Sequence, residues 1–395
     1  MGNRRVWLAV ALLWLAGSGL RLTILAVPPL LPAIRGEFAL SATQVGLLSS
    51  IPVALFALAA VPGSLLIARL GTLTTLVAGL LIAAAGSGLR AASGSLDLLY
   101  LATGVMGFGI AIMQPVLPAV VREWLPNRIG FGTAVYTNGL LLGEIFPVLL
   151  TLPLVLGWVG GSWRAALGVW SIPLAITGVL VAIAAPRPTP KQPAAPQAPK
   201  PVVTGRWWPD WRSPLTWQLG ALMGSVNSMY FATNAFLPPY LSTTGRAHLI
   251  SGALGALNFS QLPSSLLLLA VASRIERRGW PYLVAGIMAL LGVIGMASTT
   301  GVWVLVSASL LGFSGSAVLT LALTLPALLS PQRDVPRTSA SMFTIGYASA
   351  MAIALVSGAA WDLSGVPRLA FLPIGLCAIA LLGSALSLQR TGHLR

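Results

Sequence analysis

Long apolar runs alternate along the chain with short breaks that carry charged residues, glycine or proline. Most of these runs reach or approach the roughly 20 residues that a helix needs to cross the hydrocarbon core of a bilayer. The runs cover residues 6–32, 44–68, 74–91, 97–121, 129–156 and 163–185, and then 214–241, 249–273, 281–298, 303–330, 337–360 and 367–389. The pattern predicts an all-α integral membrane protein with twelve transmembrane helices in two sets of six.

The amino-acid composition excludes several other classes of protein. The 395 residues are 56% hydrophobic and 8% charged, whereas soluble domains carry about a quarter of charged residues. One cysteine (Cys377) and two histidines (His248 and His393) are too few for a thiol, zinc or haem centre, so we expect no cofactor and no metal. The spans also lack a serine–histidine pair, an aspartate dyad and an HExxH motif, and the chain lacks a GxxxxGK[ST] loop. We therefore expect no enzyme activity.

The positive charge is distributed unevenly among the loops. If the N-terminus is cytoplasmic, 17 of the 23 lysines and arginines face the cytoplasm, as the positive-inside rule requires. Five others, including Arg90, are then assigned to outer segments, which leaves Arg21 as the only base within a span. We expect a multi-pass protein of the bacterial inner membrane with both termini in the cytoplasm. Its net charge of +15 would face anionic lipid rather than nucleic acid.

Residues 186–212 are rich in proline and alanine and predict an extended cytoplasmic linker. The linker would join an N-terminal six-helix bundle, residues 1–185, to a C-terminal one, residues 213–395. The two parts are related in sequence, because TILAVPPLLP from Thr23 aligns with TNAFLPPYLS from Thr233. A parallel duplication of this kind is typical of transporters that expose a central site to alternate sides of the membrane.

The turns after the second and eighth spans read SLLIARLG (64–71) and ASRIERRG (272–279). Together with the helix count, the duplication and the central linker, they make the chain resemble the major facilitator superfamily, whose turn motif is Gly-x-x-x-Asp-Arg-x-Gly. Ala68 replaces the acidic residue in the first copy. The resemblance implies a gate at the cytoplasmic end, formed by Arg69, Gly71, Glu276, Arg277 and Gly279. The alternative interpretation of these residues is an ordinary solvated turn.

Three further segments are similar to the cyanate and 2-nitroimidazole permease branch of that superfamily. They are GLRLTILAVPPLLPAI (19–34), GFGIAIMQPVLPAVV (107–121) and NSMYFATNAFLPPYL (227–241). The resemblance implies a transporter for small molecules.

Arg21 and Glu144 are the charged residues that cost most to place in a membrane. Each lies 15 residues after the start of an outward-running span, and therefore about 22 Å from its cytoplasmic end. A lone ion at such a depth costs several kcal/mol, so each needs a partner. Two interpretations remain open: a permanent ion pair that joins two helices, or an arginine that accepts an anionic substrate while Glu144 exchanges a proton.

A polar stripe in the span 214–241 is formed by Asn227, Tyr230 and Asn234, which share one helical face. Such a face turns inward, either to bond neighbouring helices or to line a watery cavity. Other candidates for substrate binding of the same kind are Gln114, Tyr136, Asn258 and Gln261.

Residues Gly130, Gly139 and Gly143 resemble the glycine pattern of superfamily drug–proton antiporters, although Glu144 stands where the pattern has proline. Close helix packing is the alternative interpretation.

The sequence as a whole predicts a secondary active transporter that works by alternating access. It would move a small anion or weak organic acid, similar to cyanate, nitrate or a carboxylate, together with a proton. The expected partners are this substrate, protons and the lipid bilayer, and we expect a monomer. The alternative is a proton-coupled exporter of amphipathic drugs or nitro-heterocycles.

Overall fold

The computed structural model describes residues 3–126, 128–186, 210–275, 277–331 and 334–394, and every regular element in these ranges is a helix. Most of the linker predicted at 186–212 lies outside the described residues. Large apolar side chains such as Leu58, Ile183 and Leu291 are exposed around the outside, as expected of helices that face lipid.

The N-terminal half is built from the helices that follow in chain order: α1 (Asn3–Gly19), α2 (Leu22–Leu25), η1 (Pro28–Leu30), α3 (Leu31–Phe38), α4 (Ala42–Leu70), α5 (Thr72–Ala91), α6 (Leu96–Trp124), α7 (Ile129–Leu150), the π-helical turn η2 (Thr151–Val155), α8 (Leu156–Trp158) and α9 (Trp163–Ala184). The C-terminal half comprises α10 (Pro214–Thr243), η3 (Ala247–Leu249), α11 (Ile250–Phe259), α12 (Gln261–Ile275), α13 (Trp280–Ser298), α14 (Val302–Leu329), α15 (Val335–Ser364), η4 (Pro367–Ala370) and α16 (Phe371–Arg390).

Among the described residues, nine stretches are long and apolar enough to cross a membrane: Val6–Phe38, Thr72–Ala91, Leu96–Trp124, Phe131–Trp158, Trp163–Ala184, Trp280–Ser298, Val302–Pro326, Thr338–Ser364 and Pro367–Arg390. The three other predicted spans, 44–68, 214–241 and 249–273, are occupied by α4, by α10 and by the pair α11–α12. The all-α membrane fold is thus confirmed, and nine of the twelve predicted spans meet this criterion of length and hydropathy.

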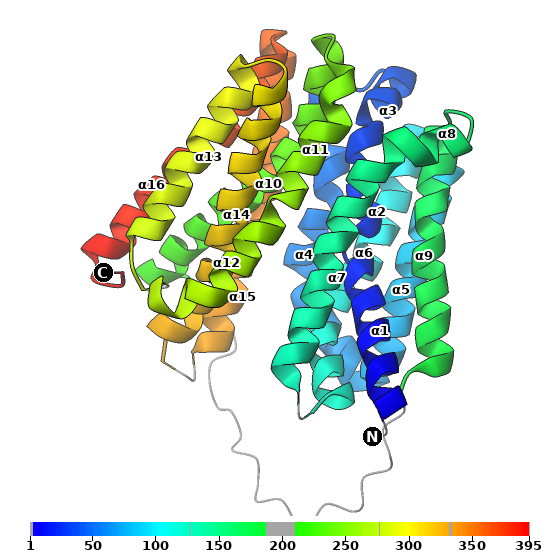
Figure 1. Ribbon diagram of the computed structural model, residues 1–395, viewed down its shortest axis with the longest axis vertical. Coiled ribbons are helices and arrows are strands. Elements are labelled where there is room, and N and C mark those ends of the chain that lie inside the picture. The colour runs from blue at the N-terminus through cyan, green and yellow to red at the C-terminus, as the bar shows by residue number, and fades with distance from the viewer. Residues whose placement is uncertain (1–2, 127, 187–209, 276, 332–333, 395) are drawn as a thin grey trace, which may run out of the picture.

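The two halves lie side by side, with α1–α9 in one bundle and α10–α16 in the other (Figure 1). They meet at the end of the molecule opposite the start of α1, and their helices diverge toward the end where α1 begins. At the closed end, Asp362 of α15 accepts hydrogen bonds from the backbone N–H groups of Ala42 and Thr43, each at 2.7 Å. The Thr43 hydroxyl donates to the same carboxylate at 2.6 Å, so α15 holds the N-terminus of α4.

A second contact between the halves, at the same end, depends on a proline. Pro153 has no N–H to donate to the carbonyl of Leu149, four residues before it, and the helix loosens into the π-helical turn η2. The Leu149 carbonyl accepts a hydrogen bond from the Ser251 hydroxyl of α11 at 3.3 Å instead. A helix irregularity therefore supplies an acceptor for the opposite half.

Small residues bring α1 and α7 into backbone contact. A side-chain carbon added at Gly143 would collide with the backbone of Ser18, and one added at Gly17 would collide with the backbone of Tyr136. Gly139 is equally close to α1. The interpretation of the glycine pattern as close helix packing is confirmed for Gly139 and Gly143. This close approach brings together Glu144, which directly follows Gly143, and Arg21, which lies four residues after Gly17.

Candidate functional site

A cavity of about 320 Å³ lies between the two halves. Its volume is at the lower end of the range for small-molecule sites. Its polar wall is formed by Arg21, Gln114, Tyr136, Thr137, Glu144, Asn227, Tyr230, Gln261, Ser265, Ser316, Thr320 and Tyr347. The remaining wall is mostly apolar and includes leucines from both halves and methionines and phenylalanines from the C-terminal half.

Arg21 reaches the cavity because the first predicted span is broken. α1 ends at Gly19 and α2 begins at Leu22, and the N–H groups of Leu20 and Arg21 bond to carbonyls only three residues back. The tightened turn places Arg21 between two helical segments, with φ −127° and ψ −24°. Discontinuous helices in transporters commonly form binding sites in this way.

The Arg21 guanidinium pairs with Glu144, because Nε lies 3.2 Å from Oε1. The depth calculation that placed both residues in one layer is thereby confirmed. The two side chains are 13% and 4% exposed, so the pair is largely removed from solvent. Arg21 also lies over the rings of Phe56 and Phe231, at 5.6 and 5.2 Å from their centroids, and its Nη1 has no hydrogen-bond partner. One donor of the guanidinium is therefore unused.

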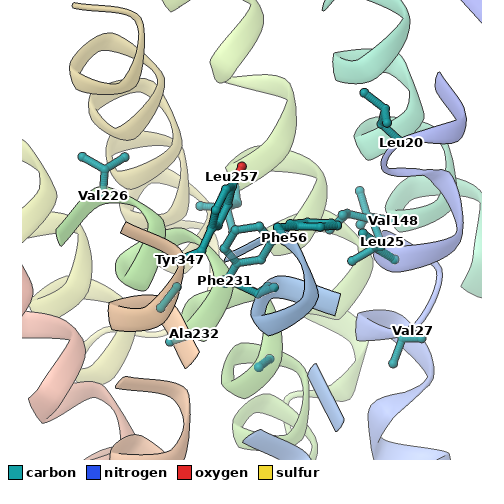
Figure 2. Packing of buried hydrophobic residues seen from close by; sticks show 14 of the residues in the cluster. Leu20, Leu25, Val27, Phe56, Val148, Val226, Phe231, Ala232, Leu257 and Tyr347 are labelled. Carbon is teal, nitrogen blue, oxygen red and sulfur yellow. The ribbon is translucent and has the colours of Figure 1, made fainter. Parts of the chain in front are cut away.

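The aromatic rings of Phe56, Phe231 and Tyr347 lie close to one another (Figure 2). Phe56 of the N-terminal half meets Tyr347 of the C-terminal half edge to face, with centroids 5.4 Å apart. Tyr347 also stacks on Phe343, with centroids 6.1 Å apart. Because Phe56 and Tyr347 come from different halves, the wall beside Arg21 changes whenever the halves move.

Glu144 also bonds to the opposite half. Its Oε2 accepts a hydrogen bond from Gln261 Nε2 at 3.0 Å. Gln261 begins α12 at a break after α11, where Pro263 removes the N–H that would bond to the Phe259 carbonyl. The break turns the first side chain of α12 into the cavity. One carboxylate thus bonds to an arginine of its own half and to an amide of the other.

The polar network continues behind the cavity wall. Asn258 accepts a hydrogen bond from the Tyr230 hydroxyl at 2.7 Å and donates to Asn234 Oδ1 at 3.2 Å. The amide of Asn234 donates in turn to the backbone carbonyl of Tyr230 at 3.0 Å. These bonds fix the orientation of Tyr230, whose ring lines the cavity.

The predicted binding residues therefore separate into two layers. Those that line the cavity are Arg21, Gln114, Tyr136, Asn227, Tyr230 and Gln261, together with Glu144. Asn234 and Asn258 are buried behind them and bond to protein groups. Asn227 is also buried, and its Nδ2 has no partner although the residue lines the cavity. This amide, like Arg21 Nη1, has a donor free for a ligand.

The first predicted gate turn lies between α4 and α5. Gly71 has φ +80°, in the left-handed region that favours glycine, and it ends α4 and caps α5. Arg69, two residues earlier, is exposed. The glycine is required by the turn itself.

The second gate turn lies between α12 and α13. Arg277 is exposed and donates to the carbonyl of Leu328 at 3.3 Å, within its own half. Gly279 is buried beside the side chain of Gln389. Glu276 lies outside the described residues, and the gate role of both turns stays a prediction.

The structure corrects the predicted position of Arg90. Its assignment to an outer loop was wrong: it lies in the last turn of α5 and is fully buried. Its Nη2 donates to the Thr23 carbonyl at 2.9 Å and to the Ser87 hydroxyl at 2.8 Å. Arg21 is therefore not the only base within a span. The aromatic residues around Arg21 were also missed, because an apolar letter within a membrane span carries no positional signal.

Comparisons with known proteins agree with this architecture. The chain is 28% identical over 353 residues to the 2-nitroimidazole transporter of Escherichia coli (strain K12), covering 88% of this chain and 86% of that protein. It is 26% identical over 373 residues to the cyanate transport protein CynX of the same organism, covering 93% and 94%. These relatives match the permease branch that the sequence motifs resemble.

A solved structure with a similar fold is the inward-facing, occupied form of a bacterial homolog to the human lysosomal transporter Spinster. It has a TM-score of 0.72 at 14% identity and covers 98% of this chain and 96% of its own. The family model of the Major Facilitator Superfamily matches residues 6–355. Because the family model matches most of the chain and the fold agrees with it, the chain belongs to the major facilitator superfamily. It is a multi-pass membrane transporter and not an enzyme.

Proposed function

We propose that this transporter moves a small anion or weak organic acid, similar to cyanate, nitrate or a short carboxylate, together with a proton. The observation that carries the proposal is the Arg21–Glu144 pair, which faces the cavity with Arg21 Nη1 unpartnered. A guanidinium presents planar donors that match the oxygen or nitrogen atoms of such anions. Asn227 Nδ2 offers a second free donor in the same cavity.

Charge balance supplies the link to protons. Without substrate, Arg21 and Glu144 neutralise each other. When an anion binds Arg21, two negative charges share one positive charge in a site removed from bulk water, which is unfavourable at low dielectric. A proton on Glu144 restores the balance. The expected ratio is one proton for each monovalent anion, so that transport carries no net charge.

The hydrogen bond between Glu144 and Gln261 connects this exchange to the movement of the halves. It joins α7 to α12 across the cavity at 3.0 Å. A carboxylate is a stronger acceptor than its protonated form, so protonation weakens the bond between the halves. Binding of anion and proton would thereby favour the rearrangement that exposes the cavity on the other side.

The remaining features of the proposal follow from the topology. We place both termini in the cytoplasm of a bacterial inner membrane, with residues 1–185 and 213–395 as the moving bundles and 186–212 as their linker. The contacts at Asp362 and Ser251 then close the outer side. Arg69, Gly71, Glu276, Arg277 and Gly279 would form the gate on the inner side.

An exporter of nitro-heterocycles or amphipathic drugs is the second candidate. It is favoured by the apolar part of the cavity wall, which includes Leu140, Met223 and Val226, and by the relative that transports 2-nitroimidazole. Such a substrate would lie on the aromatic rings and would need no arginine.

Uptake into proteoliposomes separates the two candidates. We would measure [14C]cyanate and [14C]2-nitroimidazole accumulation with and without an imposed proton gradient, for wild type, Arg21→Gln and Glu144→Gln. Anion transport predicts gradient-driven cyanate uptake that falls at least tenfold in Arg21→Gln. In Glu144→Gln, exchange of cyanate would continue but accumulation driven by the gradient would be lost.

Arg164 and Glu37 provide a matched control, because they form an ion pair at 2.6 Å but do not line the cavity. Arg164→Gln and Glu37→Gln should keep uptake within about twofold of wild type. Uptake of 2-nitroimidazole that persists in Arg21→Gln, with no cyanate uptake in any form, would favour the exporter. Gradient-driven uptake that survives Glu144→Gln would refute its role in coupling.

A further inference from the structure

A second, smaller cavity of about 30 Å³ lies between the halves. Its wall is formed by residues of α2, η1, α4, α5 and α6 from the N-terminal half and of α10 from the C-terminal half. Arg90, Ser49, Thr103 and Asn234 are its polar lining residues. A cavity of this size holds about one water molecule.

The lining includes donors that have no acceptor. Arg90 is fully buried, and although its Nη2 donates to Thr23 and Ser87, its Nε and Nη1 have no partner. The hydroxyl of Ser49 is also buried without a partner. Buried donors are normally satisfied, so three unused donors around one cavity point to an acceptor that occupies it.

The charge of Arg90 is not balanced by a neighbour among the described contacts. Both of its hydrogen-bond partners are neutral oxygens. The carboxylates of Glu144 and Glu37 pair with other arginines, and Asp362 is bonded to the start of α4. A buried cation without a counter-charge is costly, and an anion in the cavity would offset that cost.

Phe231 connects this cavity to the central one, because it lines both. The Arg21 guanidinium lies 5.2 Å from the centroid of its ring. Arg90 in turn bonds to the carbonyl of Thr23, two residues after Arg21. The two arginines thus serve two cavities that share one aromatic wall, and Arg90 lies on the side where the halves are closed.

We propose that the cavity at Arg90 is a second anion subsite, which takes the same small monovalent anion as the central cavity when the halves part at the closed end. Because α10 contributes one wall and the N-terminal half the others, parting of the halves enlarges the cavity. An anion leaving or approaching Arg21 would then pass to Arg90 around Phe231. This inference rests on the proposed function for the identity of the anion.

The test uses the full-length protein in detergent with nitrate as the probe. We would follow the apparent Tm while nitrate replaces gluconate at constant ionic strength, because a ligand that binds the folded state raises its stability. The variants are Arg21→Gln, Arg90→Gln, and Arg21→Gln combined with Arg90→Gln. Arg21→Gln combined with Arg164→Gln removes the same charge away from the cavity and is the matched control.

A second subsite predicts a saturable rise of Tm with nitrate in Arg21→Gln, which the matched control keeps and the Arg21→Gln/Arg90→Gln variant loses. Since Arg90 also bonds to Thr23, its replacement affects folding as well. Ser49→Leu in the Arg21→Gln background fills the cavity and keeps Arg90, and it should abolish the rise too. A rise that survives Ser49→Leu or Arg90→Gln in that background overturns the proposal.

The two proposals fail in different ways. No nitrate response in Arg21→Gln, with a response in wild type and Arg90→Gln, overturns the second subsite and leaves the central anion site standing. No response in Arg90→Gln, which retains Arg21, overturns the central anion site instead. No response in any form overturns both.

Discussion

Removal of both charges of the central pair should leave a more stable protein than removal of either one. In Arg21→Met, the Glu144 carboxylate keeps hydrogen bonds from neutral groups alone, such as the Gln261 amide. In Glu144→Leu, the Arg21 guanidinium loses its counter-charge and keeps neutral neighbours, such as the rings of Phe56 and Phe231 and the side chain of Tyr347. Loss of one partner of a buried ion pair costs about 3–5 kcal/mol, whereas replacement of both by apolar side chains is often neutral.

The cavity reduces this cost, because it is large enough to hold water beside the orphaned charge. We therefore expect each single substitution to lower the free energy of unfolding by about 2 kcal/mol, and the double substitution Arg21→Met/Glu144→Leu by about 1 kcal/mol. The coupling free energy is then about 3 kcal/mol, at the upper end of values for residues in contact.

Equilibrium unfolding of the detergent-solubilised protein, followed by tryptophan fluorescence, measures the loss of unfolding free energy in the two single variants and in the double variant. The exposed pair Arg164–Glu37 gives a reference cycle, for which we expect a clearly smaller coupling. Losses that simply add in the central cycle would refute the reasoning. They would mean that each charge is solvated independently and that the pair contributes nothing as a unit.

Three further predictions concern the helix contacts. Asp362→Asn removes the negative charge from the N-terminus of α4, an interaction worth about 1 kcal/mol. The ratio of open to closed molecules at this end should therefore rise about fivefold, as measured by distances between spin labels on α4 and α15. An unchanged distance distribution would contradict this. Gly143→Val should abolish transport and lower thermal stability, because the added side chain meets the backbone of α1. Gly383→Ala is the control and should do neither, because Gly383 has open space around it. Equal stability of the two variants would exclude a packing role for Gly143. Cys377, which is 7% exposed, should react with a maleimide only after denaturation, and rapid labelling of the native protein would show that α16 opens.

The sequence was informative wherever a simple physical rule links residue order to position. The rise of 1.5 Å per residue placed Arg21 and Glu144 at one depth, and they form an ion pair. The glycines at 139 and 143 pack against α1 as small residues in membrane helices do.

Other features depend on three-dimensional context that a single sequence does not hold. Arg90 is surrounded by glycine, alanine and serine, a composition typical of a loop, yet the fold buries it against α2. Periodicity placed Asn234 on the face of Asn227 but did not reveal that Asn258 covers it. The break at Arg21 likewise depends on packing, since the nearest proline, Pro28, lies seven residues later.

α10 has a consequence for how the protein reaches the membrane. Every residue from Leu222 to Leu241 except Tyr230 is buried, because α10 packs against α14, α15 and α16 of its own half and α4 of the other. Free of the need to face lipid, it carries polar side chains and is not among the nine apolar stretches. Since partition into the bilayer depends on apolar content, α10 on its own would insert poorly. Its entry into the membrane during synthesis should therefore depend on the helices that later surround it.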